Sequence, residues 1–322
     1  MNENFTVKFW GVRGSHPAPG PQTVYYGGNT ACVEVRAAGQ TIILDAGTGI
    51  IPLGRELARR YAASEPAERE APHLVLLFSH LHHDHTQGFP FFSPAYNPNA
   101  RLYLYGPGAS EQALEQVLAQ NQTPPAFPVS LRDMSAGKEI RALKETDLIS
   151  FENGLPRFGK PAAVGDLSIR WMRSYAHPGQ VYIYRIEWRG LSLVYATDTE
   201  GYVGGDQRLA AFAQGADLLI HDAQYSQADY AMKQGFGHST PQMAAGLACA
   251  AGVKHLALFH HDPCYDDETV NDLERQARTC FEPAFAAREG LTFELSAPAK
   301  AGRVGASRAP FAVENASTQR AR

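Results

Sequence analysis

The run HLHHDH at residues 80–85 concentrates side chains that commonly bind metal ions, directly after an apolar, strand-like stretch. In α/β folds, chemistry gathers where a buried strand reaches the surface. His80 and His82, two residues apart in an extended loop, can converge on one ion, whereas Asp84 and His85 turn toward a second. An ordered H-x-H-x-D-H pattern after such a strand favours two adjacent metal ions over a solvated histidine-rich loop.

Further candidate ligands follow three later apolar stretches. His177, Asp198 and the pair His260-His261 each come just past the end of one of them. A rigid sheet can hold a site whose side chains come from distant parts of the chain. The four predicted strands are Leu74–Phe78, Arg170–Ser174, Leu191–Tyr195 and Leu256–Phe259.

Composition is typical of a soluble globular enzyme. The chain has 322 residues, of which 44% are hydrophobic and 19% charged, so it can bury a sizeable core. The candidate ligands interleave from residue 80 to residue 260, and a domain boundary inside that span would divide the site. A single domain over residues 1–296 is therefore predicted. Residues 297–322 combine small residues with arginines and are predicted to form a disordered tail.

Charge and cysteine usage limit the partners and the compartment. The formal net charge is -4, so the whole chain lacks the basic footprint that captures long nucleic acids. The four cysteines form no C-x-x-C pair, and no segment has the roughly 20 consecutive apolar residues that span a membrane. A cytoplasmic protein with reduced thiols and no membrane contact is predicted, and a homo-oligomer is left open.

Several separate motifs between about Phe5 and about Leu295 resemble the metallo-β-lactamase superfamily, most closely its branch of ribonuclease Z and related phosphodiesterases. The resemblance implies an α/β fold, a four-layer αβ/βα sandwich of two mixed sheets with helices outside. Besides the metal-ligand run, the motifs are FWGVRGS (9–15), YGGNT (26–30), IILDAGTG (42–49), LIHDAQY (219–225) and GHSTPQ (237–242). The expected helices are Ile50–Tyr61, Ala109–Gln120, Gln207–Gln214, Pro241–Ala251 and Asp267–Arg288.

The same resemblance implies two ligand groups joined by one bridging carboxylate. His260 is preferred to His261 because it lies directly at the strand end. All ligands are nitrogen or oxygen, which favours zinc and leaves manganese or iron open. The implied ligands are His80, His82 and His177 for one metal, Asp84, His85 and His260 for the other, and Asp198 as the bridge.

Two divalent ions about 3.5–4 Å apart can hold a bridging hydroxide at neutral pH and clamp a phosphodiester. The leaving alkoxide then needs a proton. As the resemblance implies, His238 is the predicted general acid, held by Asp222, and Asp84 is counted with them as catalytic. The alternative is a purely structural role, in which His238 lies at the start of the following helix and its neighbours Ser239 and Thr240 cap that helix.

These observations predict a dinuclear metal-dependent phosphodiesterase that acts on a small diester or cyclic nucleotide. The interval 121–165 lacks the long Gly-Pro-rich arm by which ribonuclease Z grips transfer RNA, so RNA is not the favoured substrate. Ribonuclease Z-like processing of transfer RNA 3′ ends is the first alternative. Hydrolysis of a lactone or thioester is the second. A non-catalytic metal-binding sensor is the third.

Overall fold

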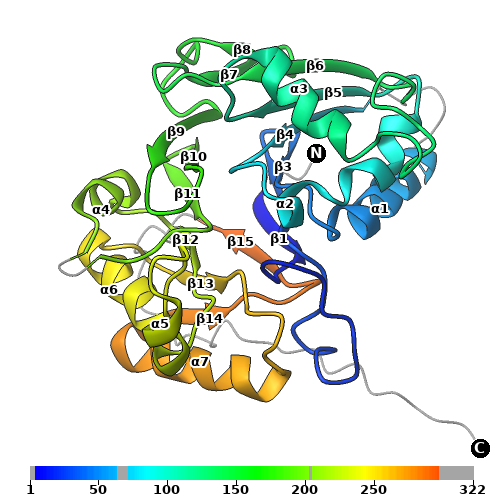
Figure 1. The fold of residues 1–322 in the computed structure, drawn as a ribbon. Coiled ribbons are helices and arrows are strands. Elements are labelled where there is room, and N and C mark those ends of the chain that lie inside the picture. The colour runs from blue at the N-terminus through cyan, green and yellow to red at the C-terminus, as the bar shows by residue number, and fades with distance from the viewer. Residues whose placement is uncertain (1–3, 64–71, 203–204, 297–322) are drawn as a thin grey trace, which may run out of the picture.

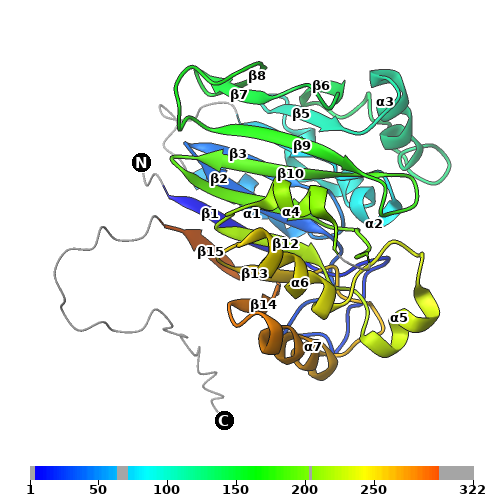
Figure 2. The ribbon, with the colours of Figure 1, turned by 90° about the vertical axis from the view of Figure 1, so that its left-hand side faces the viewer.

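The computed structural model describes residues 4–63, 72–202 and 205–296, so the predicted tail at 297–322 lies outside the described residues. Two mixed β-sheets pack face to face, with helices on their outer faces (Figure 1). The strand axes of the two sheets are roughly aligned across the molecule (Figure 2). The predicted four-layer sandwich is confirmed.

The first sheet has seven strands in the order β15-β1-β2-β3-β4-β5-β6. Strands β3 to β6 are parallel, whereas β15, β1 and β2 pair antiparallel with their neighbours. The bounds are β1 Phe5–Gly11, β2 Cys32–Ala37, β3 Gln40–Leu44, β4 His73–Leu77, β5 Arg101–Gly106, β6 Gly137–Ala142 and β15 Thr292–Leu295.

The second sheet has eight strands in the order β14-β13-β12-β11-β10-β9-β7-β8. Strands β11 to β14 are parallel, and β10, β9, β7 and β8 are antiparallel. The bounds are β7 Ile149–Glu152, β8 Leu155–Phe158, β9 Ser168–Ser174, β10 Val181–Trp188, β11 Leu191–Ala196, β12 Leu218–Asp222, β13 Leu256–Phe259 and β14 Ala284–Ala286.

Residue patterning explains the layers. In β1 every second residue is buried, among them Phe5, Val7 and Phe9, which face the core between the sheets. The apolar β4 lies between two parallel neighbours and is buried on both faces from Leu74 to Leu77. A second core lies beneath α1 (Ile50–Ala63) and α3 (Glu111–Gln120), and a third lies beneath α4 (Gln207–Ala213), α6 (Pro241–Ala251) and α7 (Asp267–Cys280).

The helices are α1 Ile50–Ala63, α2 His83–Thr86, α3 Glu111–Gln120, α4 Gln207–Ala213, α5 Gln227–Lys233, α6 Pro241–Ala251 and α7 Asp267–Cys280, with the short 3₁₀ turns η2 Phe89–Phe91 and η3 Ser93–Tyr96. The predicted end of the last helix at Arg288 is wrong. The helix ends at Cys280 because Pro283 cannot continue it, and the chain then enters β14. The short helix α5 was not predicted. No helix in the described residues could span a membrane.

Candidate metal centre and active site

The candidate site lies where β3, β4, β11, β12 and β13 end. Three of the residues that follow these strands have left-handed backbones: φ is 61° at Asp45, 49° at Asp198 and 63° at His260. Non-glycine residues adopt this conformation uncommonly, and residues held in it by the surrounding structure cluster at functional sites. The sharp turns bring side chains from separate strands toward one another.

The first cluster consists of His80, His82 and His177. Nδ1 of His82 lies 3.0 Å from Nε2 of His177, and the His80 ring lies 4.4 Å and 4.9 Å from the other two rings. Nε2 of His80 is buried and has no hydrogen-bond partner among the described residues. Burial lowers the pKa of each of the three imidazoles, which favours the neutral form that binds metals.

The second cluster consists of Asp84, His85 and His260. Nε2 of His260 lies 3.1 Å from Oδ2 of Asp84 and 3.2 Å from Nε2 of His85. Nε2 of His85 is 3.3 Å from the same Asp84 oxygen. Burial would raise the pKa of Asp84, but the adjacent His85 and His260 rings lower it far below its usual range. The carboxylate is therefore ionised, as a ligand must be.

Asp198 lies between the clusters and directs one oxygen toward each. Its Oδ2 is 3.5 Å from Nε2 of His80 and 3.8 Å from Nε2 of His177. Its Oδ1 is 3.3 Å from Nε2 of His85 and 3.2 Å from Nε2 of His260. This is the arrangement that a bridging carboxylate requires.

The residues present fit a pair of divalent cations. In each cluster the donor atoms of the histidines and carboxylates lie within 4.8 Å of one another. They are nitrogen and oxygen atoms without a thiolate, which suits zinc, manganese or iron. Nε2 of His80 is buried without a hydrogen-bond partner among the described residues, and in the neutral ring it can offer a lone pair to a cation.

Asp45 supports the centre from behind, and sequence reasoning missed it. Its buried carboxylate lies 2.8 Å from Nδ1 of His85 and accepts hydrogen bonds from Ser79 and from the Tyr195 hydroxyl, the latter at 2.7 Å. A carboxylate on the far nitrogen of a ligand histidine orients the ring and raises its basicity. Its position after β3, like that of the ligands after their strands, is the signal that could have identified it.

His238 lies against both clusters. Its ring stacks on His260 at 5.0 Å and meets His177 edge-on at 5.1 Å, and its Nδ1 is 2.7 Å from Oδ2 of Asp222. Burial lowers the pKa of His238, but the charge of Asp222 and the hydrogen bond to it raise the pKa, to about 9 on balance. Thr240 caps α6, so the helix start also holds His238 in place.

The two adjacent histidines that follow β13 have different surroundings. The His260 side chain lies in the second cluster, whereas Nε2 of His261 lies 2.9 Å from the Ala287 carbonyl, outside both clusters. The loop that carries His16 approaches the site, because the backbone N–H of Ser15 donates to Asp84 at 2.7 Å. Cys264 is exposed and belongs to neither cluster.

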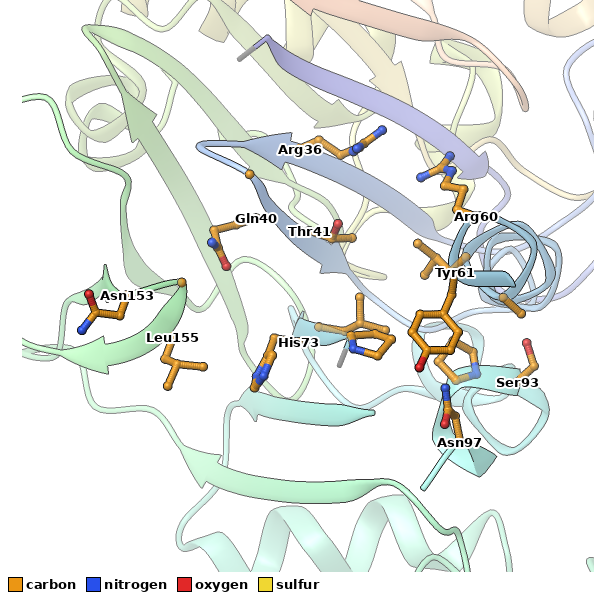
Figure 3. A pocket seen from close by; sticks show the side chains of 17 residues that line it. Arg36, Gln40, Thr41, Arg60, Tyr61, His73, Ser93, Asn97, Asn153 and Leu155 are labelled. Atoms are coloured by element: carbon orange, nitrogen blue, oxygen red, sulfur yellow. The ribbon is translucent and has the colours of Figure 1, made fainter. Parts of the chain in front are cut away.

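A pocket of about 850 Å³ lies on the first sheet, at the end of β4 away from the candidate site (Figure 3). His73, the first residue of β4, lines it together with Tyr61 and Asn97, whereas the metal-binding run follows the other end of β4. A five-residue strand separates the two by roughly 16 Å. None of the residues that line this pocket belongs to either cluster.

Comparisons with known proteins agree with the fold. Residues 40–261 match the family described as the beta-lactamase superfamily domain. A ribonuclease Z from Gemmatimonas aurantiaca is 27% identical over 90% of this chain and 96% of its own length. A ribonuclease Z from Prochlorococcus marinus is 30% identical over 68% of this chain and 79% of its own.

Two solved structures share the fold. The metallo-β-lactamase fold protein YhfI from Bacillus subtilis has a TM-score of 0.62 and 21% identity, over 91% of this chain and all of its own. A diphosphatase from the PhnP family has a TM-score of 0.61 and 18% identity, over 91% of this chain and 98% of its own. The family match spans more than half of the sequence, and the chain therefore belongs to the metallo-β-lactamase superfamily, in its ribonuclease Z-like branch.

Proposed function

We propose that this chain is a dinuclear metal-dependent phosphodiesterase that hydrolyses small diesters. The observation that carries the proposal is the position of Asp198, whose two oxygens face two separate clusters of nitrogen and oxygen donors. Membership in the family supports a metal-dependent hydrolase. The choice of a phosphodiester as substrate rests on the Asp222–His238 pair beside the clusters.

The clusters would hold one ion at His80, His82 and His177 and one at Asp84, His85 and His260, with Asp198 between them. A pair of bound ions would supply a water whose pKa is lowered to about 7, and positive charge to hold the oxygens of a phosphodiester. Asp45 fixes the His85 ring through Nδ1, which leaves Nε2 directed into the centre. The backbone N–H of Ser15 fixes the Asp84 carboxylate in the same way.

His238 would supply the proton that a leaving alkoxide needs. Asp222 accepts from Nδ1 of His238, so the proton on Nε2 is the mobile one. Asp222 is itself held by the backbone N–H groups of Ser239 at 2.8 Å and Gln224 at 3.2 Å. The ring contacts of His238 with His177 and His260 support this role, because these two histidines belong to different clusters.

Two observations favour a small substrate. The formal net charge of the chain is -4, which opposes non-specific capture of a polyanion. Residues 121–165 return to the sheets as β6, β7 and β8, rather than forming an extended arm for transfer RNA.

A ribonuclease Z-like endonuclease is the second candidate. Relatives that carry this name align with nearly the whole chain, and the same centre and acid would serve an RNA phosphodiester. The deciding experiment compares kcat/KM on a cyclic nucleotide, a dinucleotide, a precursor transfer RNA with a 3′ trailer, and a lactone. We expect the highest values on small phosphodiesters. Efficient, site-specific removal of the trailer would favour the second candidate, and activity on the lactone alone would contradict both.

A further inference from the structure

A cavity of about 410 Å³ lies beside the first histidine cluster. His80 forms part of its wall, and Gly179, another lining residue, lies against His82: a Cβ atom built on Gly179 would be 3.8 Å from Nε2 of that histidine. The cavity therefore adjoins the position at which the proposed centre would hold the reacting phosphodiester.

The walls of the cavity come from both sheets. Residues 107–109, between β5 and α3, form one side, and the β9–β10 connection contributes Gly179 and Gln180. Leu81, Arg173 of β9 and Tyr182 of β10 complete the lining. Arg173 is its one formally charged side chain, apart from any charge on His80.

Arg173 is held in place by tyrosines. Its Nη2 donates to the Tyr182 hydroxyl at 3.2 Å, and that hydroxyl donates to the Leu143 carbonyl at 3.0 Å. The guanidinium also interacts with the hydroxyl of Tyr175, whose side chain is exposed next to the cavity-lining strand. Because the tyrosines are neutral, they orient the cation without cancelling its charge.

The charge of Arg173 is not neutralised by an acidic partner. Within residues 4–63, 72–202 and 205–296, no carboxylate oxygen lies within 4.0 Å of its guanidinium nitrogens, and Nε is buried without a hydrogen-bond partner. Glu145 is the neighbouring acid, and it accepts at 3.2 Å from the backbone N–H of Arg173 rather than from the side chain. The Arg173 guanidinium is therefore a fixed cation without a paired carboxylate, and it lies beside the proposed hydrolytic centre. Such a group is suited to bind an anionic part of the substrate.

We infer that this cavity binds a second phosphate of the substrate through the Arg173 guanidinium. The inference rests on the proposed phosphodiesterase function and narrows its substrate class to diesters that carry a further phosphate, such as phosphorylated dinucleotides. A 3′,5′-cyclic nucleotide has a single phosphate and would leave the cavity without an anion. The exposed ring of Tyr175 offers a face on which a base can stack.

The test uses the metal-loaded protein and three substrates: the dinucleotide ApA, its 5′-phosphorylated form pApA and its 3′-phosphorylated form ApAp. We expect kcat/KM for at least one phosphorylated form to exceed that for ApA about tenfold or more, mainly through KM, as for a charge-assisted hydrogen bond. In Arg173→Gln this ratio should fall close to one. Arg173→Lys keeps the charge but loses the planar fork, so it should give an intermediate ratio and carries the test if the Gln variant does not fold.

Arg157→Gln is the matched control. Arg157 lies in β8 of the same sheet, its partly exposed side chain pairs with Glu152 at 2.6 Å, and it does not line the cavity. The Arg157→Gln variant should keep the wild-type ratio of kcat/KM between the phosphorylated dinucleotides and ApA. Equal kcat/KM values for the three substrates in the wild type, or an unchanged ratio in Arg173→Gln, would overturn the second-phosphate site while leaving the phosphodiesterase in place. If the protein cleaves none of the three dinucleotides and also fails to cleave a p-nitrophenyl diester, the proposed function is overturned, and the inference with it.

Discussion

Nδ1 of His85 lies 2.8 Å from Oδ2 of Asp45, a buried carboxylate that follows a different strand. The contact leaves Nε2 of His85 directed toward Asp84, Asp198 and His260. One side chain outside the clusters therefore determines how a central member of the second cluster is oriented. This relationship leads to the first of four testable predictions.

Asp45→Asn should weaken metal binding about 10–100-fold, because the amide no longer offers His85 a charged acceptor. Competition with a chelator measures the affinity. Asp217→Asn is the control: Asp217 is also buried and accepts from Ser192 and Lys254, but it lies outside both clusters. It should lower the melting temperature without changing metal affinity, and equal loss of affinity in both variants would contradict the supporting role of Asp45.

Asp198→Ala should reduce the metal content of both clusters and abolish turnover, because one carboxylate faces both. Elemental analysis of the purified protein should give two ions per chain for the wild type and fewer than one for the variant. Asp206→Ala, which removes the N-cap of α4, should lose about 1 kcal/mol of stability and keep both ions. A fully active Asp198→Ala protein in metal-replete buffer would exclude the dinuclear mechanism.

His238→Ala should bind metal normally and lose about 10²-fold or more in rate on an alkyl phosphodiester. On a p-nitrophenyl diester the loss should be much smaller, because that leaving group departs without a proton. Asp222→Asn should show the same pattern more weakly, since Asp222 holds the imidazole rather than donating. Equal losses on both substrates, with metal content intact, would show that His238 does not protonate the leaving group.

Gly14→Ala should impair the second cluster selectively. A Cβ atom at this position would lie 2.4 Å from Cε1 and Nδ1 of His260, so the histidine ring must shift, at a cost of about 1–3 kcal/mol for such overpacking. Gly20→Ala, in the same loop, meets nothing within 4 Å and serves as the control. Metal titration and steady-state kinetics should separate the two variants. Indistinguishable metal affinities would mean that the loop yields without moving His260.

The sequence was sufficient to predict the sandwich, through its resemblance to a known superfamily, and to nominate the side chains that meet at the candidate site. Apolar strands followed directly by histidine or aspartate are local patterns, and the neighbouring ends of strands in a sheet bring such residues together. His80, Asp198 and His260 could be named for this reason, although they are far apart in the chain. The helix Pro241–Ala251 was predicted with its bounds and with Thr240 as a capping residue, because capping depends on neighbouring residues in the chain.

Tertiary structure decided what depends on distance and direction. The left-handed backbone of His260 turns its ring into the second cluster and leaves His261 against the Ala287 carbonyl, a choice that two adjacent histidines do not reveal by type. The contacts of Asp45 with His85 and Tyr195, and the cavity around Arg173, join segments that no local pattern relates. A sequence pattern specifies which groups a strand presents, whereas their mutual orientation arises only when separate strands pack.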